Sequence, residues 1–134
     1  MASQEGLLSL MRYYLWSNQM NVHLRQYTGK DNAAKSFVAT DYVFLQLYMS
    51  LWCASLYVVI EGWGRLNLHD SAVDVLLASP NVALLKKFRN GVFHYQNAVF
   101  HEKLKALAER TDVSDWVVKL HEELGRCIPE FLQK

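Results

Sequence analysis

The amino-acid sequence predicts an all-α fold, a bundle of four main helices with one or two short helices. Apolar residues recur every three or four positions along most of the chain, and no segment shows the sustained period-two alternation of a β-strand. Only two prolines and six glycines occur among the 134 residues, so long helices are expected. A chain of this length that is 51% hydrophobic is expected to form a single domain, residues 1–134, around one core.

The first helix is expected over residues 5–27. Its core-facing stripe is predicted to consist of Leu8, Met11, Leu15, Asn18 and Val22, widened by Leu7, Tyr14 and Trp16. Asn18 lies within this apolar stripe. We interpret it as a polar residue that forms a hydrogen bond with another helix, because buried polar groups are nearly always paired.

The most apolar helix is expected over residues 37–63. Residues 42–60 carry no formal charge, and such a run reaches the lower range of a membrane span. The run also contains three tyrosines, and Asp41 and Glu61 flank it, so no asymmetry of Lys and Arg assigns an orientation. A central bundle helix that is buried nearly all round is therefore favoured over a span.

Turn and cap residues delimit the other helices. Gly62 and Gly64 are expected to end the apolar helix. Asp70 is expected to be the N-cap of a short helix that ends at Ala78, and Pro80 suits the start of the next helix. Two more helices are expected, one from about Val99 to Arg110 with Phe100, Leu104 and Leu107 inward, and an amphipathic one that contains Trp116, Val117, Leu120, Leu124 and Ile128 and ends before Pro129.

The helix that follows Pro80 carries an unusual arrangement of side chains. On a helical wheel its predicted buried stripe consists of Leu84, Leu85, Phe88, Gly91, Val92 and Tyr95. The opposite arc is polar and contains Lys86, Arg89, Asn90, His94 and Asn97, with Lys87 just beyond it. A solvated face would not need the aromatic Phe93, which lies inside the polar arc.

Positive charge is concentrated around this helix, although the net charge of the chain is only +1. Residues 86–110 hold Lys or Arg at positions 86, 87, 89, 103, 105 and 110, against Glu102 and Glu109. Such a patch is either a site for phosphate or an ordinary solvated face.

Several classes of chemistry have no motif in this chain. None of the five histidines forms the Glu-x-x-His pair of a di-iron bundle, and the segments that begin at His101 and His121 lack the second histidine of a zinc-protease motif. Neither a glycine-rich phosphate loop nor a Gly-x-Ser-x-Gly elbow is present. The remaining candidate site consists of Arg89, Asn90 and His94.

The segment Arg89-Asn90-Gly91-Val92-Phe93-His94 resembles the Arg-Asn-x-x-x-His signature that HEPN domains carry on a late helix. The surroundings are similar too, because a long apolar helix ends in an acid and Gly-Trp, and a proline and a Leu-rich run then lead into Arg-Asn. The resemblance in helix order covers most of the chain. It implies a HEPN-like helical bundle and a metal-independent endoribonuclease whose active site is completed across a homodimer. It also implies a role as a toxin or phage-defence effector.

The chemistry of the three residues suits cleavage of RNA, which carries its own nucleophile in the ribose 2′-OH. His94 can act as general base or acid near neutral pH. Arg89 can hold a phosphate and stabilise transition-state charge. On a helix Asn90 lies one turn before His94, so it can orient the imidazole or donate to a phosphate oxygen. No metal and no cofactor are expected.

Neighbouring residues receive supporting roles. Lys86, Lys87, Phe93 and Asn97 are predicted to contact RNA, and Phe93 is expected either to be covered by the partner subunit or to stack on a base. Tyr95 is predicted to support the site from behind. Glu61 either orients a basic residue of the motif or simply emerges into solvent. A structural alternative also remains open, in which Arg89 simply pairs with Glu61 or another acid and His94 is a partly exposed surface residue.

Two other functions remain open at this point. A HEPN-like domain can be a non-catalytic interaction module that binds a partner such as a nucleotidyltransferase-like antitoxin, and the run 42–60 can be a membrane span. The first residues lack the basic and apolar regions of a signal peptide, and Cys53 in the apolar run is most simply a core residue. A cytoplasmic protein with no membrane association is therefore expected.

Overall fold

The computed structural model describes residues 2–28, 39–97 and 110–134, and within these ranges the chain is helical with no strand. The helices are α1 (Gln4–Thr28), α2 (Ala39–Arg65), α3 (Ser71–Leu77), α4 (Asn81–Val92) and α6 (Thr111–Leu132). The predicted all-α bundle is therefore confirmed, with α3 as a short helix among longer ones. The helix expected from about Val99, with Phe100, Leu104 and Leu107, lies outside the described residues.

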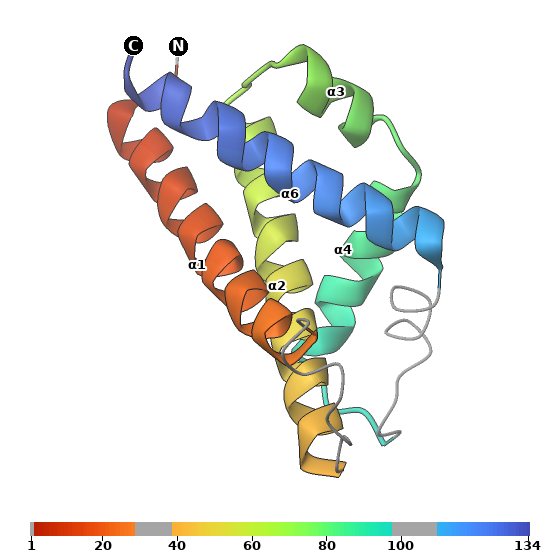
Figure 1. Ribbon diagram of the computed structural model, residues 1–134. Coiled ribbons are helices and arrows are strands. Elements are labelled where there is room, and N and C mark those ends of the chain that lie inside the picture. The colour runs from red at the N-terminus through yellow and green to blue at the C-terminus, as the bar shows by residue number, and fades with distance from the viewer. Residues whose placement is uncertain (1, 29–38, 98–109) are drawn as a thin grey trace.

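The helices form one bundle around a shared core. Helices α1 and α2 run side by side in opposite directions, α4 packs on α2, and α6 crosses the bundle in contact with α1 and α3 (Figure 1). Each helix contributes to a continuous apolar cluster, whose fully buried members include Leu56, Val73, Leu85, Leu120 and Leu124.

Helix α1 buries a face that is shifted by one residue from the predicted stripe. Its buried side chains are Leu7, Leu10, Tyr14, Ser17 and Asn21, whereas Leu8, Leu15 and Trp16 are each 55% exposed. Small residues explain this register: a Cβ at Gly6 would lie 2.7 Å from Leu66, and the Ser17 hydroxyl donates to the Trp52 carbonyl oxygen at 3.1 Å. The middle of α2 and the residue after its end thus come close to α1 on this face.

Helix α2 runs through Gly62 and Gly64 to Arg65, so the expectation that these glycines end it was wrong. The described glycines all have negative φ, and the left-handed residue after the helix is Asn67, with φ 53°. Gly62 serves packing instead, because a Cβ there would lie 2.8 Å from the Leu10 side chain.

Helix α2 is also not buried nearly all round, contrary to the prediction. Its C-terminal half buries Trp52, Leu56, Val59 and Trp63, but near its start Tyr42, Val43, Phe44 and Leu47 are all more than 40% exposed. Residues 41–65 form a helix that is long and apolar enough to cross a membrane, with one third of its most apolar window buried in the bundle. The start of α2 therefore presents an apolar surface.

Helix α6 continues past Pro129 to Leu132, so the expected end before this proline was wrong. Proline removes one backbone donor, and here the loss falls in the last turn and a half of the helix. The strongly apolar side of α6 buries Val113, Val117, Leu120 and Leu124. This packing outweighs the unfavourable effect of Pro129 on the helix.

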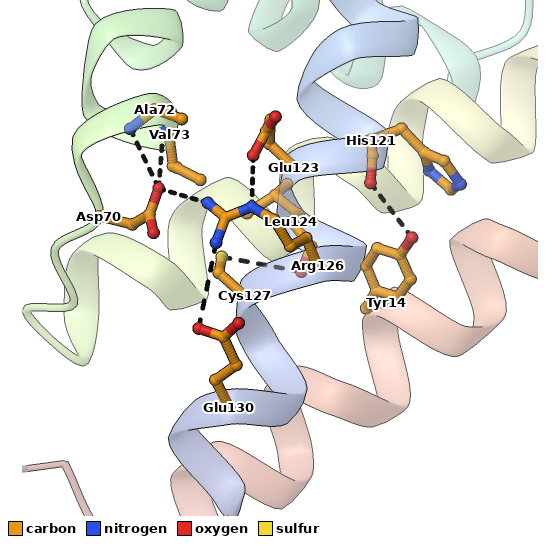
Figure 2. A network of polar contacts seen from close by, with 10 residues as sticks. All are labelled: Tyr14, Asp70, Ala72, Val73, His121, Glu123, Leu124, Arg126, Cys127 and Glu130. Carbon is orange, nitrogen blue, oxygen red and sulfur yellow. Dashed lines mark hydrogen bonds and ion pairs between the residues drawn. The ribbon is translucent and has the colours of Figure 1, made fainter.

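An arginine on α6 fastens the short helix α3 to the bundle. Arg126 Nη2 donates to Asp70 Oδ1 at 2.8 Å, and its Nε donates to Glu123 Oε2 at 2.6 Å (Figure 2). Asp70 is the N-cap of α3, as predicted, and accepts from the backbone N–H groups of Ala72 and Val73. The hydrogen bond from Arg126 lowers the pKa of the Asp70 carboxyl.

Candidate functional site

Helix α4 is placed by its apolar side against α2. As predicted, it begins directly after Pro80, and the Ser79 hydroxyl accepts from the backbone N–H of Asn81 at 3.1 Å. Leu85 and Phe88 are buried, while Leu84, Gly91 and Val92 are partly buried. Because Phe88 is buried, Arg89 and Asn90 emerge at the edge of the α2–α4 contact.

Helix α4 ends earlier than predicted, at Val92. The Gly91 carbonyl accepts from the backbone N–H of His94 at 3.2 Å and from Gln96 Nε2 at 3.4 Å, which closes the last turn. Phe93 has φ −98° and ψ 10°, outside helical geometry. Tyr95 therefore leaves the buried stripe and is 91% exposed, so its predicted place in that stripe was wrong, and its supporting role at the site stays a prediction.

Arg89 is held by three contacts. Its Nη1 donates to Glu61 Oε1 at 2.6 Å, its Nε donates to Asn90 Oδ1 at 3.0 Å, and its guanidinium carbon lies 4.8 Å from the centre of the Tyr57 ring. The side chains of Arg89 and Glu61 are 24% and 32% exposed, so the pair lies at the surface without being fully hydrated. Glu61 thus meets the basic residue of the motif, one of the two alternatives from the sequence.

Asn90 and His94 do not share a helical face, because the helix ends between them. Both side chains are exposed, and the expectation that one helical turn separates Asn90 from His94 was wrong, because α4 ends at Val92. The predicted roles of Asn90, orienting the imidazole or donating to a phosphate, stay predictions. Asn90 turns its Oδ1 to Arg89, which leaves its Nδ2 group as the donor available to a ligand.

The other predicted contacts surround the same helix end. Lys86, Lys87 and Asn97 are exposed, and Phe93 is 71% exposed. These side chains are accessible to a partner or substrate, whereas Arg89 is the member of the motif that the fold holds in place.

Two grooves adjoin Phe93. One, of about 420 Å³, is lined by α2 and α4 residues that include Leu47, Leu51 and Val92. The other, of about 400 Å³, lies between α1 and α2 with Trp16 and Met20 on its walls, and Phe93 and Leu51 line both. Phe93 therefore lies between two largely apolar grooves.

Sequence reasoning missed two parts of this arrangement. Tyr57 lies in the apolar run of α2, and no pattern in the sequence indicates that its ring contacts Arg89. His121 appeared in the sequence only as part of an incomplete zinc motif, but it is a buried hydrogen-bonding residue. A signal for it existed, because both His121 and Asn18 fall among the apolar positions of their helices.

Within residues 2–28, 39–97 and 110–134, no group of three histidine, cysteine or carboxylate side chains is placed to hold a metal ion. In comparisons with models of protein families, with curated proteins and with solved structures, the chain matched none of them. The function must therefore be argued from the residues and their geometry.

Proposed function

We propose that this protein is a metal-independent endoribonuclease of HEPN type that acts as a homodimer. The observation that carries the proposal is the guanidinium of Arg89, held at the surface by Glu61 and Tyr57 on the helix that His94 follows with an exposed side chain. A cation positioned at the surface suits a phosphate, and an accessible histidine suits proton transfer near neutral pH.

The proposed reaction uses the ribose 2′-OH as nucleophile. Its oxygen bonds to the neighbouring phosphorus, and the bond from phosphorus to the 5′-oxygen breaks, which yields a 2′,3′-cyclic phosphate and a 5′-OH. One proton leaves the 2′-OH and another joins the departing 5′-oxygen, so the site needs a base and an acid. His94 provides one of them, Arg89 stabilises the charge on phosphorus, and the Asn90 Nδ2 group donates to a phosphate oxygen.

The second proton-transfer group is assigned to His94 of a second copy of the chain. Two-fold symmetry brings the same surface patch of both subunits together, so two α4 ends meet in one site. The apolar surroundings of Phe93 support such a contact. The exposed ring lies between two largely apolar grooves, and burying this surface against a partner is favourable. Lys86, Lys87 and Asn97 would line the path of the RNA.

The test is cleavage of single-stranded RNA by purified protein in EDTA. The wild-type protein should cleave, and Arg89→Ala and His94→Ala should each reduce the rate at least about a hundredfold, because each removes an essential group. His69→Ala is the matched control, since His69 is also exposed but lies before α3, away from the site. Unchanged cleavage in both site variants excludes the assignment.

A non-catalytic interaction module is the second candidate, and the Arg89–Glu61 ion pair favours it. The pair already satisfies part of the guanidinium charge, and the grooves beside Phe93 suit a protein such as a nucleotidyltransferase-like antitoxin. This candidate predicts no cleavage and a stable complex in a pull-down with that partner. Phe93→Ser should abolish the complex, whereas the control Val75→Ser, at an exposed position on α3, should preserve it.

A further inference from the structure

A cavity lined by both polar and apolar side chains lies between α1, α2 and α6, and it shares no lining residue with the α4 site. It has a volume of about 460 Å³, within the range of small-molecule sites. Helix α1 contributes Asn18, Asn21 and Arg25 to its wall, α2 contributes Trp52, and α6 contributes His121 and Glu122.

One wall of this cavity is fixed by a chain of hydrogen bonds. Trp52 Nε1 donates to His121 Nδ1 at 3.1 Å, so the ring proton of the neutral imidazole is on Nε2, which lies 3.0 Å from Asn18 Oδ1. The Tyr14 hydroxyl donates to the His121 carbonyl oxygen at 3.1 Å (Figure 2). Asn18 therefore has a defined orientation, with its Nδ2 group left as a donor for the cavity.

Asn21 lines the same cavity and is only 9% exposed. In the part of the chain that the structure describes, nothing forms a hydrogen bond with its side-chain amide. No side-chain nitrogen or oxygen of the described residues is both fully buried and without a hydrogen-bond partner, so the Asn21 amide is open to solvent through the cavity and can exchange water for a ligand. Asn21 thus supplies an unused donor and an unused acceptor to the cavity.

Two opposite charges face the cavity from different helices. Arg25 is one helical turn after Asn21 on α1, and Glu122 lies on α6. Both act on the Tyr14 hydroxyl: the positive charge of Arg25 lowers its pKa, and the negative charge of Glu122 raises it, although burial is the main cause of its net rise. Among the described ion pairs none joins Arg25 to Glu122, so each charge can meet a group of a ligand.

We propose that this cavity binds a small zwitterion, a free α-amino acid, with its carboxylate on Arg25 and its ammonium group on Glu122. The guanidinium fork matches a carboxylate, and a carboxylate is the natural acceptor for an ammonium group. Asn21 and the Asn18 Nδ2 group donate to the ligand carboxylate, and Trp52, Leu24 and Val118 offer apolar surface to its side chain. The cavity serves this ligand independently of any reaction at α4.

The experiment titrates the full-length protein with each of the twenty amino acids and follows the Trp52 indole N–H and the His121 ring by NMR. At least one amino acid should shift both signals at millimolar concentration. Its amide derivative lacks the carboxylate and its N-acetyl derivative lacks the ammonium group, so each should bind at least tenfold more weakly, a loss of about 1.4 kcal/mol.

Variants of Arg25 and Glu122 test which group of the ligand each side chain binds. Arg25→Gln should weaken the amino acid tenfold or more but leave the weak binding of its amide unchanged, and Glu122→Gln should behave in the same way toward the N-acetyl derivative. Asn21→Leu should abolish binding without lowering the melting temperature, because it removes an amide that has no partner. Asn81→Leu on α4 is the matched control and should bind normally.

Three results would overturn the proposal. One is the absence of any shift at Trp52 and His121 with all twenty amino acids, which would leave the cavity to water. Another is equal binding by the amide and N-acetyl derivatives, because no charge would then be recognised. The third is full binding by Asn21→Leu. None of these outcomes bears on RNA cleavage, whose failure is scored separately with His94→Ala.

Discussion

Two histidines of this chain have contrasting surroundings. His121 lies in the bundle, 7% exposed, with both ring nitrogens engaged and the Tyr14 ring stacked on it at 5.2 Å. His94 lies past the end of α4, where its backbone closes the last turn and its side chain is exposed. Burial with complete pairing makes the first histidine a structural residue. Exposure leaves the side chain of the second accessible to a substrate or a partner.

The contrast extends to how each region is built. Around His121, partners come from α1, α2 and α6, so three segments far apart in the chain define one geometry. On the helix before His94, Arg89 contacts α2 through Glu61 and Tyr57. Hydrogen bonds from three helices thus define the first region, whereas an ion pair and a ring contact to one helix hold Arg89 in the second.

Replacing the two histidines should give the largest difference in stability. His121→Ala should lower the free energy of unfolding by about 3 kcal/mol, because it leaves the buried Trp52 indole N–H without an acceptor and opens a cavity. His94→Ala should change it by less than about 0.5 kcal/mol, as expected for an exposed side chain. Urea unfolding followed by circular dichroism measures both, and equal effects would show that the contrast is wrong.

The pH dependence of stability should come from His121. Burial, with the nearby charge of Arg25, lowers its pKa from 6.5 to about 4, so the folded state binds fewer protons than the unfolded state between these values. Above pH 6.5 this group should not affect the free energy of unfolding. As the pH is lowered from 6.5 to 4, the free energy of unfolding should decrease by at most about 1.4 kcal/mol per pH unit. Measured over this window, His121→Leu should show a smaller slope than the wild type. Parallel curves would count against a neutral, buried imidazole.

Two glycine substitutions should have opposite effects on the stability of the protein. A Cβ at Gly125 would overlap the Tyr14 hydroxyl beside His121, so Gly125→Ala should destabilise the protein by about 1–3 kcal/mol. A Cβ at Gly64 would have no neighbour within 4 Å, so Gly64→Ala should stabilise α2 by up to about 1 kcal/mol. The melting temperatures should move in opposite directions, and a tolerated alanine at Gly125 would mean that Tyr14 is not held in place.

A substitution at Phe93, like the one at His94, should have little effect on stability. Because this ring is 71% exposed, Phe93→Ser should change the free energy of unfolding by less than about 0.5 kcal/mol. The same substitution should weaken self-association, which sedimentation velocity measures at several protein concentrations. A marked loss of stability would place Phe93 in the core of the subunit and argue against its role at an interface.

Much of this architecture could be predicted from local signals. Helical spacing located the described helices, Asp70 was identified as an N-cap, and Asn18 was identified as a polar residue that bonds across helices, a prediction confirmed by its contact with His121. These features depend on residues close in sequence or on one polar residue in an apolar stripe.

The features that were predicted wrongly depend on packing between segments. Helix α1 is apolar on two sides, and only the close approach of neighbouring segments at Gly6 and Ser17 decides which side is buried. Gly62 permits a turn, yet the contact with Leu10 keeps it helical. The end of α4 depends on two donors to the Gly91 carbonyl, which a helical wheel does not include. The roles of Arg89, Asn90 and His94 in catalysis stay predictions.

The hydrogen bond between Trp52 and His121 also has a consequence for the folding of the chain during its synthesis. The two residues are 69 positions apart, and Tyr14 is 107 positions from the carbonyl it bonds. Helices α1 and α2 thus leave the ribosome and pair while the surface that receives α6 is still bare. Only when the last helix emerges are these donors satisfied and the core closed. Apolar surface that is exposed in this way favours aggregation and chaperone binding in general, so a truncated product that lacks α6 should be degraded.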